Sequence, residues 1–278
     1  MEGAATTLCG WGARAGVYLE LRSRILDVLR LTQITFACED PHAQAEFWAA
    51  TLVYEGGRHG DRWIASDPRE EGPSLSFIRM AKSPTIELPI HLDVNVPDRE
   101  AEVQRLLGLG ARLVTTKTQS IGTLEETWTV LRDPEGNGFC VQGPDPRKAH
   151  PYVGNVTFSC AEPRRLGRFW SEALGWPEQD DPEEFLQMLR DTGLDPAEFE
   201  AYFATRNPDG SRPRFLFQRR ERSRPEAYPI HLDFTTHDRA AEITRLTSAG
   251  ATVVERKTRD ERTWTVLRDP EGNPFCVE

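Results

Sequence analysis

The sequence predicts an α+β protein of two tandem units, each built from paired modules of one strand, one helix and about three further strands. Two observations predict this fold class. A long internal duplication divides the chain, and a strand–cap–helix pattern begins four times along it. The 278 residues are enough for about two domains.

Three pairs of segments show the duplication. Residues 128–141 and 264–277 differ at one position of fourteen, residues 90–106 and 230–246 share ten of seventeen, and residues 33–48 match residues 155–170. We therefore predict an extension at 1–31 (disordered or a short helix), unit one at 32–143, a proline-rich linker at 144–151 and unit two at 152–278. Unit two has a helical insert at about 181–205, expected to cover the pocket of unit two as a lid.

The same local signals open each module. An alternating strand at 34–38 is followed by Asp40-Pro41, which is typical of a helix start, and residues 90–96 are followed by Asp98. Gly108 and Gly110 end the second predicted helix. Further strands are predicted at 74–79, 113–117, 127–132 and 138–142.

Alternation along these strands gives each sheet a polar face. Leu92 and Val94 share one face of their strand, while His91 and Asp93 share the other. Unit two repeats this with His231 and Asp233, and the first strands place Gln33 and Asn155 on their polar faces. A polar sheet face is either solvated or lines a cavity, and here we predict a cavity.

Composition excludes several classes of protein. The net charge is −10, which argues against nucleic-acid and anionic-membrane partners, and no apolar run is long enough to span a membrane. The five cysteines are few and odd in number, as expected of reduced thiols in the cytoplasm.

Three sequence features resemble the vicinal oxygen chelate (VOC) superfamily, and within it the bacterial glyoxalase-like (glyoxalase/bleomycin resistance/dioxygenase) domains. They are the FW helix, the IHLD strand and the DPEGN-x-F-C turn and strand, and the resemblance covers nearly everything after Arg30. It implies paired βαβββ modules enclosing a pocket. The superfamily includes glyoxalase I, extradiol dioxygenases, fosfomycin-modifying enzymes, epimerases and metal-free bleomycin-sequestering proteins, so it does not imply one chemistry.

The resemblance also implies where metal ligands would lie, on the first strand of each module and on the final strand. These positions are Gln33, His91 and Cys140 in unit one, and Asn155, His231 and Cys276 in unit two. The strand before IHLD adds Gln218 in unit two, and the family's usual last-strand Glu is Cys in both units. The predicted pocket residues are Gln33, His91, Asp93, Trp128, Cys140, Asn155, Gln218, His231, Asp233, Trp264 and Cys276.

This ligand count favours a cytoplasmic protein that binds a small organic molecule without a complete metal site and without a cofactor. The alternative is a metal-dependent lyase, isomerase or dioxygenase, with His91 and His231 holding Zn, Fe, Mn or Ni. Asp93 and Asp233 could be ligands or could orient the imidazoles. A His–Cys nucleophile is a further alternative, whereas glyoxalase I activity itself is not expected. The two units could pair within the chain or in a homodimer.

Two other groups of residues have structural explanations. The DPEGN segments at 133–137 and 269–273 are predicted to be turns between strands rather than carboxylate clusters. Trp48 and Trp170 are predicted to pack in the core, while Trp128 and Trp264 could border the pocket and stack on a ligand.

Overall fold

The computed structural model describes residues 29–80, 89–121, 124–145, 148–179, 183–191, 193, 201–220, 229–259 and 262–278. Most of the extension predicted at 1–31 and part of the insert predicted at 181–205 lie outside these residues. Among the described helices, none is long and apolar enough to cross a membrane.

Unit one contains two modules with the predicted order of elements. The first is β1 (Arg30–Cys38), α2 (Pro41–Leu52), β2 (Glu55–His59), β3 (Arg62–Ser66) and β4 (Ser74–Arg79). The second is β5 (Ile90–Asn95), α3 (Arg99–Gly108), β6 (Arg112–Ile121), β7 (Leu124–Arg132) and β8 (Gly138–Gln142).

Unit two repeats this plan with one change. Its first module is β9 (Tyr152–Cys160), α4 (Pro163–Leu174), α5 (Glu183–Asp191), β10 (Tyr202–Ala204) and β11 (Arg214–Arg219). Its second is β12 (Ile230–Thr235), α6 (Arg239–Ser248), β13 (Thr252–Arg259), β14 (Arg262–Arg268) and β15 (Pro274–Val277). The α+β prediction with four modules is confirmed. Within the described residues of unit two, α5 and β10 lie where unit one has the strands β2 and β3.

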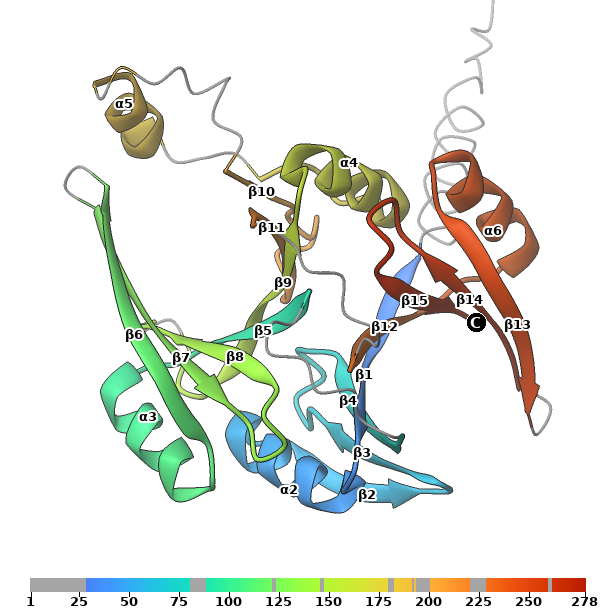
Figure 1. Ribbon diagram of the computed structural model, residues 1–278, viewed down its shortest axis with the longest axis horizontal. Helices are drawn as coiled ribbons and strands as arrows, with labels where there is room; N and C mark the ends of the chain where they lie inside the picture. Colours follow the sequence, from blue (N-terminus) through green and yellow to red (C-terminus); the bar gives the residue numbers. More distant parts are fainter. Residues whose placement is uncertain are drawn as a thin grey trace, which may run out of the picture.

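The two units exchange modules to build two sheets (Figure 1). Sheet A has the order β13-β14-β15-β12-β1-β4-β3-β2, and sheet B has the order β10-β11-β9-β5-β8-β7-β6. Strand β1 runs antiparallel to β12, and β9 runs antiparallel to β5. Each sheet therefore combines one module of unit one with one module of unit two.

The two junctions have the same register. Thr35 lies opposite His231 where β1 meets β12, and Thr157 lies opposite His91 where β9 meets β5. The duplicated units are thus joined reciprocally, so the chain has the internal symmetry of a twofold dimer.

The helices begin where the sequence predicts. Asp40 accepts hydrogen bonds from the backbone N–H groups of His42 and Ala43, at 3.1 and 3.2 Å, and Asp98 caps α3 through the N–H of Ala101. Helix α4 differs, because Glu162 at its N-cap makes no side-chain capping bond.

Trp48 of α2 and Trp170 of α4 lie in the hydrophobic core, each between the two sheets. The Trp170 ring lies 5.3 Å from Phe234 of sheet A and 5.8 Å from Phe158 of sheet B, between ring centroids. Trp48 contacts one ring of each sheet in the same way. These tryptophans therefore join the two modules of their own unit, as the prediction of core packing required.

The DPEGN segments are turns whose aspartates are buried. The Asp133 carboxylate accepts hydrogen bonds from Gln44, from Asn137 and, at 3.3 Å, from the Trp48 indole N–H. Asp269 accepts equivalent bonds from Trp170 and Asn273. Burial raises the pKa of Asp269 to about 6, although these donors oppose the shift. Asp133 therefore attaches its turn to helix α2, and Asp269 attaches its turn to helix α4.

Sheet A curves until its two edges meet. Eight strands about 4.8 Å apart would span roughly 34 Å if the sheet were flat. Yet Arg259 at the end of edge strand β13 forms a 2.5 Å ion pair with Asp61, in the turn between β2 and β3 at the other edge. Helices α2 and α6 lie outside this curve, so the polar face lines its interior (Figure 1).

Candidate functional site

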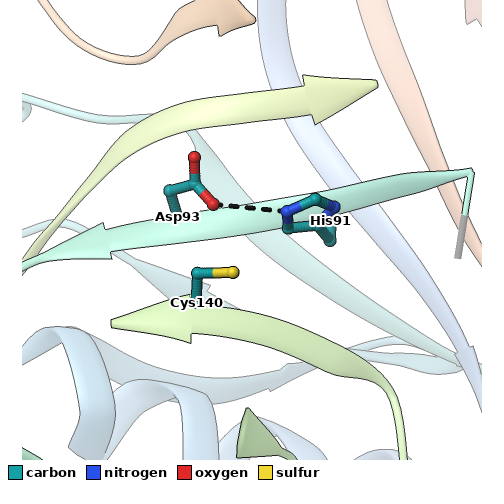
Figure 2. A group of neighbouring side chains, drawn as sticks. All are labelled: His91, Asp93 and Cys140. Atoms are coloured by element: carbon teal, nitrogen blue, oxygen red, sulfur yellow. Dashed lines mark ion pairs between the residues drawn. The ribbon is translucent and has the colours of Figure 1, made fainter. Parts of the chain in front are cut away.

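Three side chains meet on the polar face of sheet B (Figure 2). His91 and Asp93 come from β5 and Cys140 from the neighbouring strand β8. One ligand atom of each lies within 4.8 Å of the others, and His91 Nε2 lies 3.3 Å from Asp93 Oδ1. All three residues are buried.

Asp93 is the acceptor at the centre of this group. Besides His91, it accepts hydrogen bonds at Oδ2 from Asn155 Nδ2 at 2.8 Å and from Thr157 Oγ1 at 2.7 Å. Burial alone would raise the pKa of Asp93, but the hydrogen bond and charge of His91, with the bonds from Asn155 and Thr157, lower it overall. The carboxylate is therefore ionised in the folded protein at neutral pH.

The Cys140 thiol is held in its protonated form. Burial raises its pKa well above the ordinary value, and the negative charge of Asp93 and a hydrogen bond to it act in the same direction. This environment opposes the thiolate that a nucleophilic cysteine needs.

Arg214 of β11 completes the sheet B site. Its Nε donates to Asn155 Oδ1 at 2.6 Å, and its guanidinium also donates to Gln179 Oε1 at 2.5 Å. Asn155 therefore donates to Asp93 through its amide nitrogen and accepts from Arg214 at its amide oxygen.

Sheet A carries the equivalent site, with His231 and Asp233 on β12 and Cys276 on β15. His231 Nε2 lies 3.2 Å from Asp233 Oδ1, and Thr35 Oγ1 donates to Asp233 Oδ2 at 2.5 Å. Burial and the charge of Asp233 raise the pKa of Cys276. The site is more open, because the exposed fraction of the aspartate side chain is 15% here and 2% for Asp93.

An arginine also binds the first-strand amide of sheet A, but it comes from another strand. Arg62 of β3 donates to Gln33 Oε1 at 3.3 Å, whereas Arg214 occupies the strand next to β9. In both sites a guanidinium therefore binds the side-chain amide of the first strand, but the two arginines do not occupy equivalent positions of the duplicated unit.

The grouping expected from the sequence is wrong in one respect. Gln33 was expected to join His91 and Cys140, but it lies opposite Asp233 in sheet A. Asn155 was expected to join His231, but it bonds Asp93 in sheet B. The correction follows from module exchange, because each site combines strands of both units.

The described end of the unit two insert lies in a different sheet from the one expected. This end, β10, pairs with β11 in sheet B. It therefore lies in the sheet of His91 rather than that of His231.

The remaining predicted residues share the polar faces. Trp128 lies opposite Gln142, two residues from Cys140, and Val266 opposite Cys276 puts Trp264 on the face of that cysteine. Both indoles are half-buried. Gln218 is half-buried on β11, opposite Ser159 of β9.

Sequence analysis missed four residues that contact these sites. Thr35 and Thr157 lie on the predicted polar faces, two residues after Gln33 and Asn155, so alternation alone could have identified them. Arg62 and Arg214 gave no comparable signal, because a lone arginine on a strand does not reveal which residue it reaches.

The donor set fits the metal that the resemblance implies only in part. Imidazole, thiolate and carboxylate together suit zinc better than magnesium or calcium, and three protein ligands are the minimum for an open zinc site. His91, Asp93 and Cys140 supply that number, as do their sheet A equivalents. The first-strand amides do not fit, because Asn155 Oδ1 and Gln33 Oε1 each accept from an arginine, which places positive charge where a cation would bind.

Comparisons with known proteins agree with this fold. Glyoxalase I from Zea mays is 12% identical, with a TM-score of 0.61 over 90% of this chain and 92% of that chain. A candidate dioxygenase from Bacillus subtilis strain 168 is 13% identical, with a TM-score of 0.60 over 90% of this chain and 85% of that chain. No curated protein matches the chain.

These structural similarities establish the fold alone. The family model described as the glyoxalase-like domain matches twice, at residues 33–142 and 155–278. The two matches cover most of the chain and one falls on each unit. The chain therefore belongs to the glyoxalase-like domain family of the VOC superfamily, as a tandem of two such domains.

Proposed function

We propose that this chain binds a small organic molecule on the polar faces of sheets A and B, and that protein hydrogen bonds rather than a metal hold the ligand. One observation carries the proposal. The Asp93 carboxylate is already satisfied by His91, Asn155 and Thr157, and Asp233 has equivalent donors in His231 and Thr35. These side chains form complete polar groups without a cation.

Electrostatics support the same proposal. A divalent cation at Asp93 would have to displace its hydrogen bonds and remove the Cys140 proton, whose pKa is raised. It would also meet the positively charged Arg214 guanidinium. Burial and the neighbouring Arg212 lower the pKa of Arg214, whereas the negative charge of Asp93 acts to raise it. A neutral or polar organic ligand meets none of these costs, and it would find an imidazole, a guanidinium and the half-buried Trp128 indole on one face.

The state of three cysteines supports a cytoplasmic protein. Cys38, Cys140 and Cys276 are buried and form no disulfide within the described residues, as expected where thiols stay reduced.

The test begins with metal content, measured by plasma mass spectrometry on untagged protein prepared without chelator. We expect far less than one metal ion per site, and we expect chelator not to lower the melting temperature. Metal-free protein is then screened against small organic molecules by thermal shift, and hits are measured by calorimetry.

His91→Ala is the decisive variant, with His231→Ala as its matched control for the other site. Each change should leave the cooperative unfolding transition intact and weaken ligand binding at its own site by tenfold or more. Global unfolding of His91→Ala would overturn the assignment of a binding site.

A second candidate function is a metal-dependent lyase, isomerase or dioxygenase acting on a substrate with vicinal oxygens. The observation that favours it is the placement of His91, Asp93 and Cys140 ligand atoms within 4.8 Å of one another. A bound zinc ion there would polarise an oxygen of the substrate. About one metal ion per site, lost on Asp93→Asn, would favour this candidate over the first.

A further inference from the structure

The sheet B site holds an arginine that no described carboxylate contacts. Arg214 donates to the side-chain oxygens of Asn155 and Gln179, and it forms no ion pair with any described residue. Burial lowers the pKa of Arg214, because a guanidinium that is partly removed from water loses solvation. Arginines in such places are normally paired with a negative charge. No described side chain supplies that partner to Arg214.

Part of the Arg214 guanidinium is open to solvent. Its bonds to Asn155 and Gln179, at 2.6 and 2.5 Å, use two of the five N–H groups of a guanidinium. The third nitrogen, Nη2, makes no hydrogen bond within the described residues, and it is not among their buried polar atoms that lack a partner. Nη2 can therefore donate to a ligand on the polar face.

The charges around this site are mainly positive. The main charges that shift the pKa values of Arg214 and Cys140 belong to the carboxylates of Asp93 and Glu126 and to the cations of Arg212, Arg220 and Lys117. With Arg214 itself, four cations stand against two carboxylates. Asn155 separates the nearer carboxylate, Asp93, from Arg214, because it donates to the one and accepts from the other.

Sheet B curves around Arg214. The charge of Glu126 on β7 acts on Arg214 on β11, although β9, β5 and β8 lie between these strands. In a flat sheet, four spacings of about 4.8 Å would separate the two strands by roughly 19 Å, where solvent would largely screen the interaction. The curve therefore brings β7, which also carries the half-buried Trp128, toward Arg214.

Sheet A lacks this combination. Ser74 of β4 occupies the register position that Arg214 has on β11. Arg62 binds the first-strand amide instead, at 3.3 Å, and it lies next to Asp61. The charges of Arg62 and Asp61 interact, so the sheet A guanidinium has a carboxylate beside it.

The lysines of the two sites differ in the same sense. Lys117 and Lys257 lie at matched positions on the polar faces, opposite the equivalent tryptophans. Lys257 pairs with Glu255 at 2.7 Å, whereas Thr115 stands at the matched position in sheet B. Lys117 forms no ion pair within the described residues. Both sites therefore share the lysine, and only sheet B leaves its charge unpaired.

We propose that the sheet B site recognises a carboxylate of a small organic acid, whose oxygens accept hydrogen bonds from Arg214. This inference rests on the proposed function, because it names the class of ligand for the same site. A carboxylate is planar and carries one charge, which matches the fork of one guanidinium. The organic part of the acid lies toward the Trp128 indole. Sheet A, with Ser74 in place of Arg214, should not prefer an acid.

The test uses acetate, benzoate and indole-3-acetate, each compared with its uncharged amide, on the full metal-free chain labelled with ¹⁵N-arginine. Titration at a constant ionic strength of about 150 mM keeps charges that are not in contact largely screened. We expect at least one acid to bind with a Kd of about 1 mM or lower and to shift the Nε resonance of Arg214. The matching amide should bind about tenfold more weakly or worse.

Variants assign the effect to the guanidinium. Arg214→Gln should weaken binding of the acid about tenfold or more and leave binding of the amide unchanged. Arg219→Gln is the matched control, because it removes the same charge from the opposite face of β11, and Arg62→Gln is the control for sheet A. Both controls should bind the acid as the wild type does. Arg214→Lys identifies the Arg214 resonance. It also replaces Arg214→Gln if that variant does not fold, because lysine keeps the charge but loses the planar fork, so binding of the acid should still weaken.

Three results would overturn the inference. They are the absence of binding by all three acids, amides that bind as tightly as their acids, and unchanged binding of the acid in Arg214→Gln. Ligand binding that His91→Ala weakens, but that depends neither on charge nor on Arg214, would refute this inference and leave the proposed function standing. About one metal ion per site, with acid binding that still requires Arg214, would refute the proposed function and support this inference.

Discussion

Asn155 of unit two donates a 2.8 Å hydrogen bond to Asp93 of unit one. This contact crosses between the duplicated units inside the candidate site, as does the 2.7 Å hydrogen bond from Thr157 to the same carboxylate. It follows from the pairing of β9 with β5, and the pairing of β1 with β12 repeats the arrangement in sheet A. Neither site can therefore form from one unit alone.

The first prediction concerns fragments of the chain. Residues 29–151 and 152–278, produced separately, should each aggregate or self-associate, because β1, β5, β9 and β12 would lose their antiparallel partners. Co-expressed fragments should co-purify in equal amounts and unfold together, as judged by size-exclusion chromatography and thermal melting. A fragment that behaves alone as a folded monomer would contradict the module exchange.

The second prediction compares the two central carboxylates. Asp93→Asn should lower the free energy of unfolding by about 2 kcal/mol. The amide nitrogen that replaces one carboxylate oxygen cannot accept the hydrogen bonds that the neighbouring side chains donate to Asp93. Asp233→Asn should cost about half as much, since Asp233 is more exposed and water can satisfy its partners. Urea unfolding at pH 7.5 measures both. Equal losses would show that burial does not distinguish the sites.

The third prediction concerns pH. The pKa of Asp269 is about 6 in the folded protein and near 3.9 in an unfolded chain. The folded state therefore holds this proton more tightly, so the contribution of Asp269 to stability is largest below about pH 4 and is lost as pH rises through 6. Asp269→Asn should cost about 1 kcal/mol more at pH 5 than at pH 7.5 in urea unfolding. A cost that does not vary with pH would contradict the raised pKa.

The fourth prediction tests the ion pair that links the edges of sheet A. Asp61→Asn should lower the free energy of unfolding by at most about 1 kcal/mol, because both partners are exposed. It should nevertheless speed hydrogen exchange in β13 and in the turn between β2 and β3. Glu255→Gln is the matched control, because it breaks a 2.7 Å pair with Lys257 that does not join the two edges. If both variants exchange hydrogen at the same rates, Asp61 does not help to hold the two edges of sheet A together.

The fifth prediction concerns thiol reactivity. In a Cys9→Ser background, native protein should resist iodoacetamide at pH 7.5, because Cys140 and Cys276 are buried and their pKa values are raised. Protein unfolded in urea should be alkylated at all four remaining cysteines. Rapid modification of native Cys140, located by mass spectrometry, would instead support the His–Cys nucleophile.

Local features of the fold were predictable because they depend on neighbouring residues. The alternation that puts His91 and Asp93 on one face needs only the strand period, and Asp40 with Pro41 marks a helix start by itself. The partner of each strand was not predictable in this way. Gln33 has the same polar face whether β1 lies beside β12 or beside β5, because alternation fixes a face but not a neighbour.

The same limit explains what was missed in the sites. Arg62 and Arg214 reach equivalent amides from strands that do not correspond between the units, so comparing the duplicated sequences could not reveal their shared role. The buried Asp133 turn, in contrast, was identifiable as structural because its residues are those that a turn requires.

The reciprocal register of the two junctions has a consequence for how the sites can evolve. In a dimer of identical chains, every substitution changes both sites at once. Here the two copies are covalently joined and encoded separately, so each site can change without the other. Gln33 against Asn155, and Arg62 against Arg214, are such independent changes. One chain can thus keep a single architecture while its two sites diverge toward different ligands.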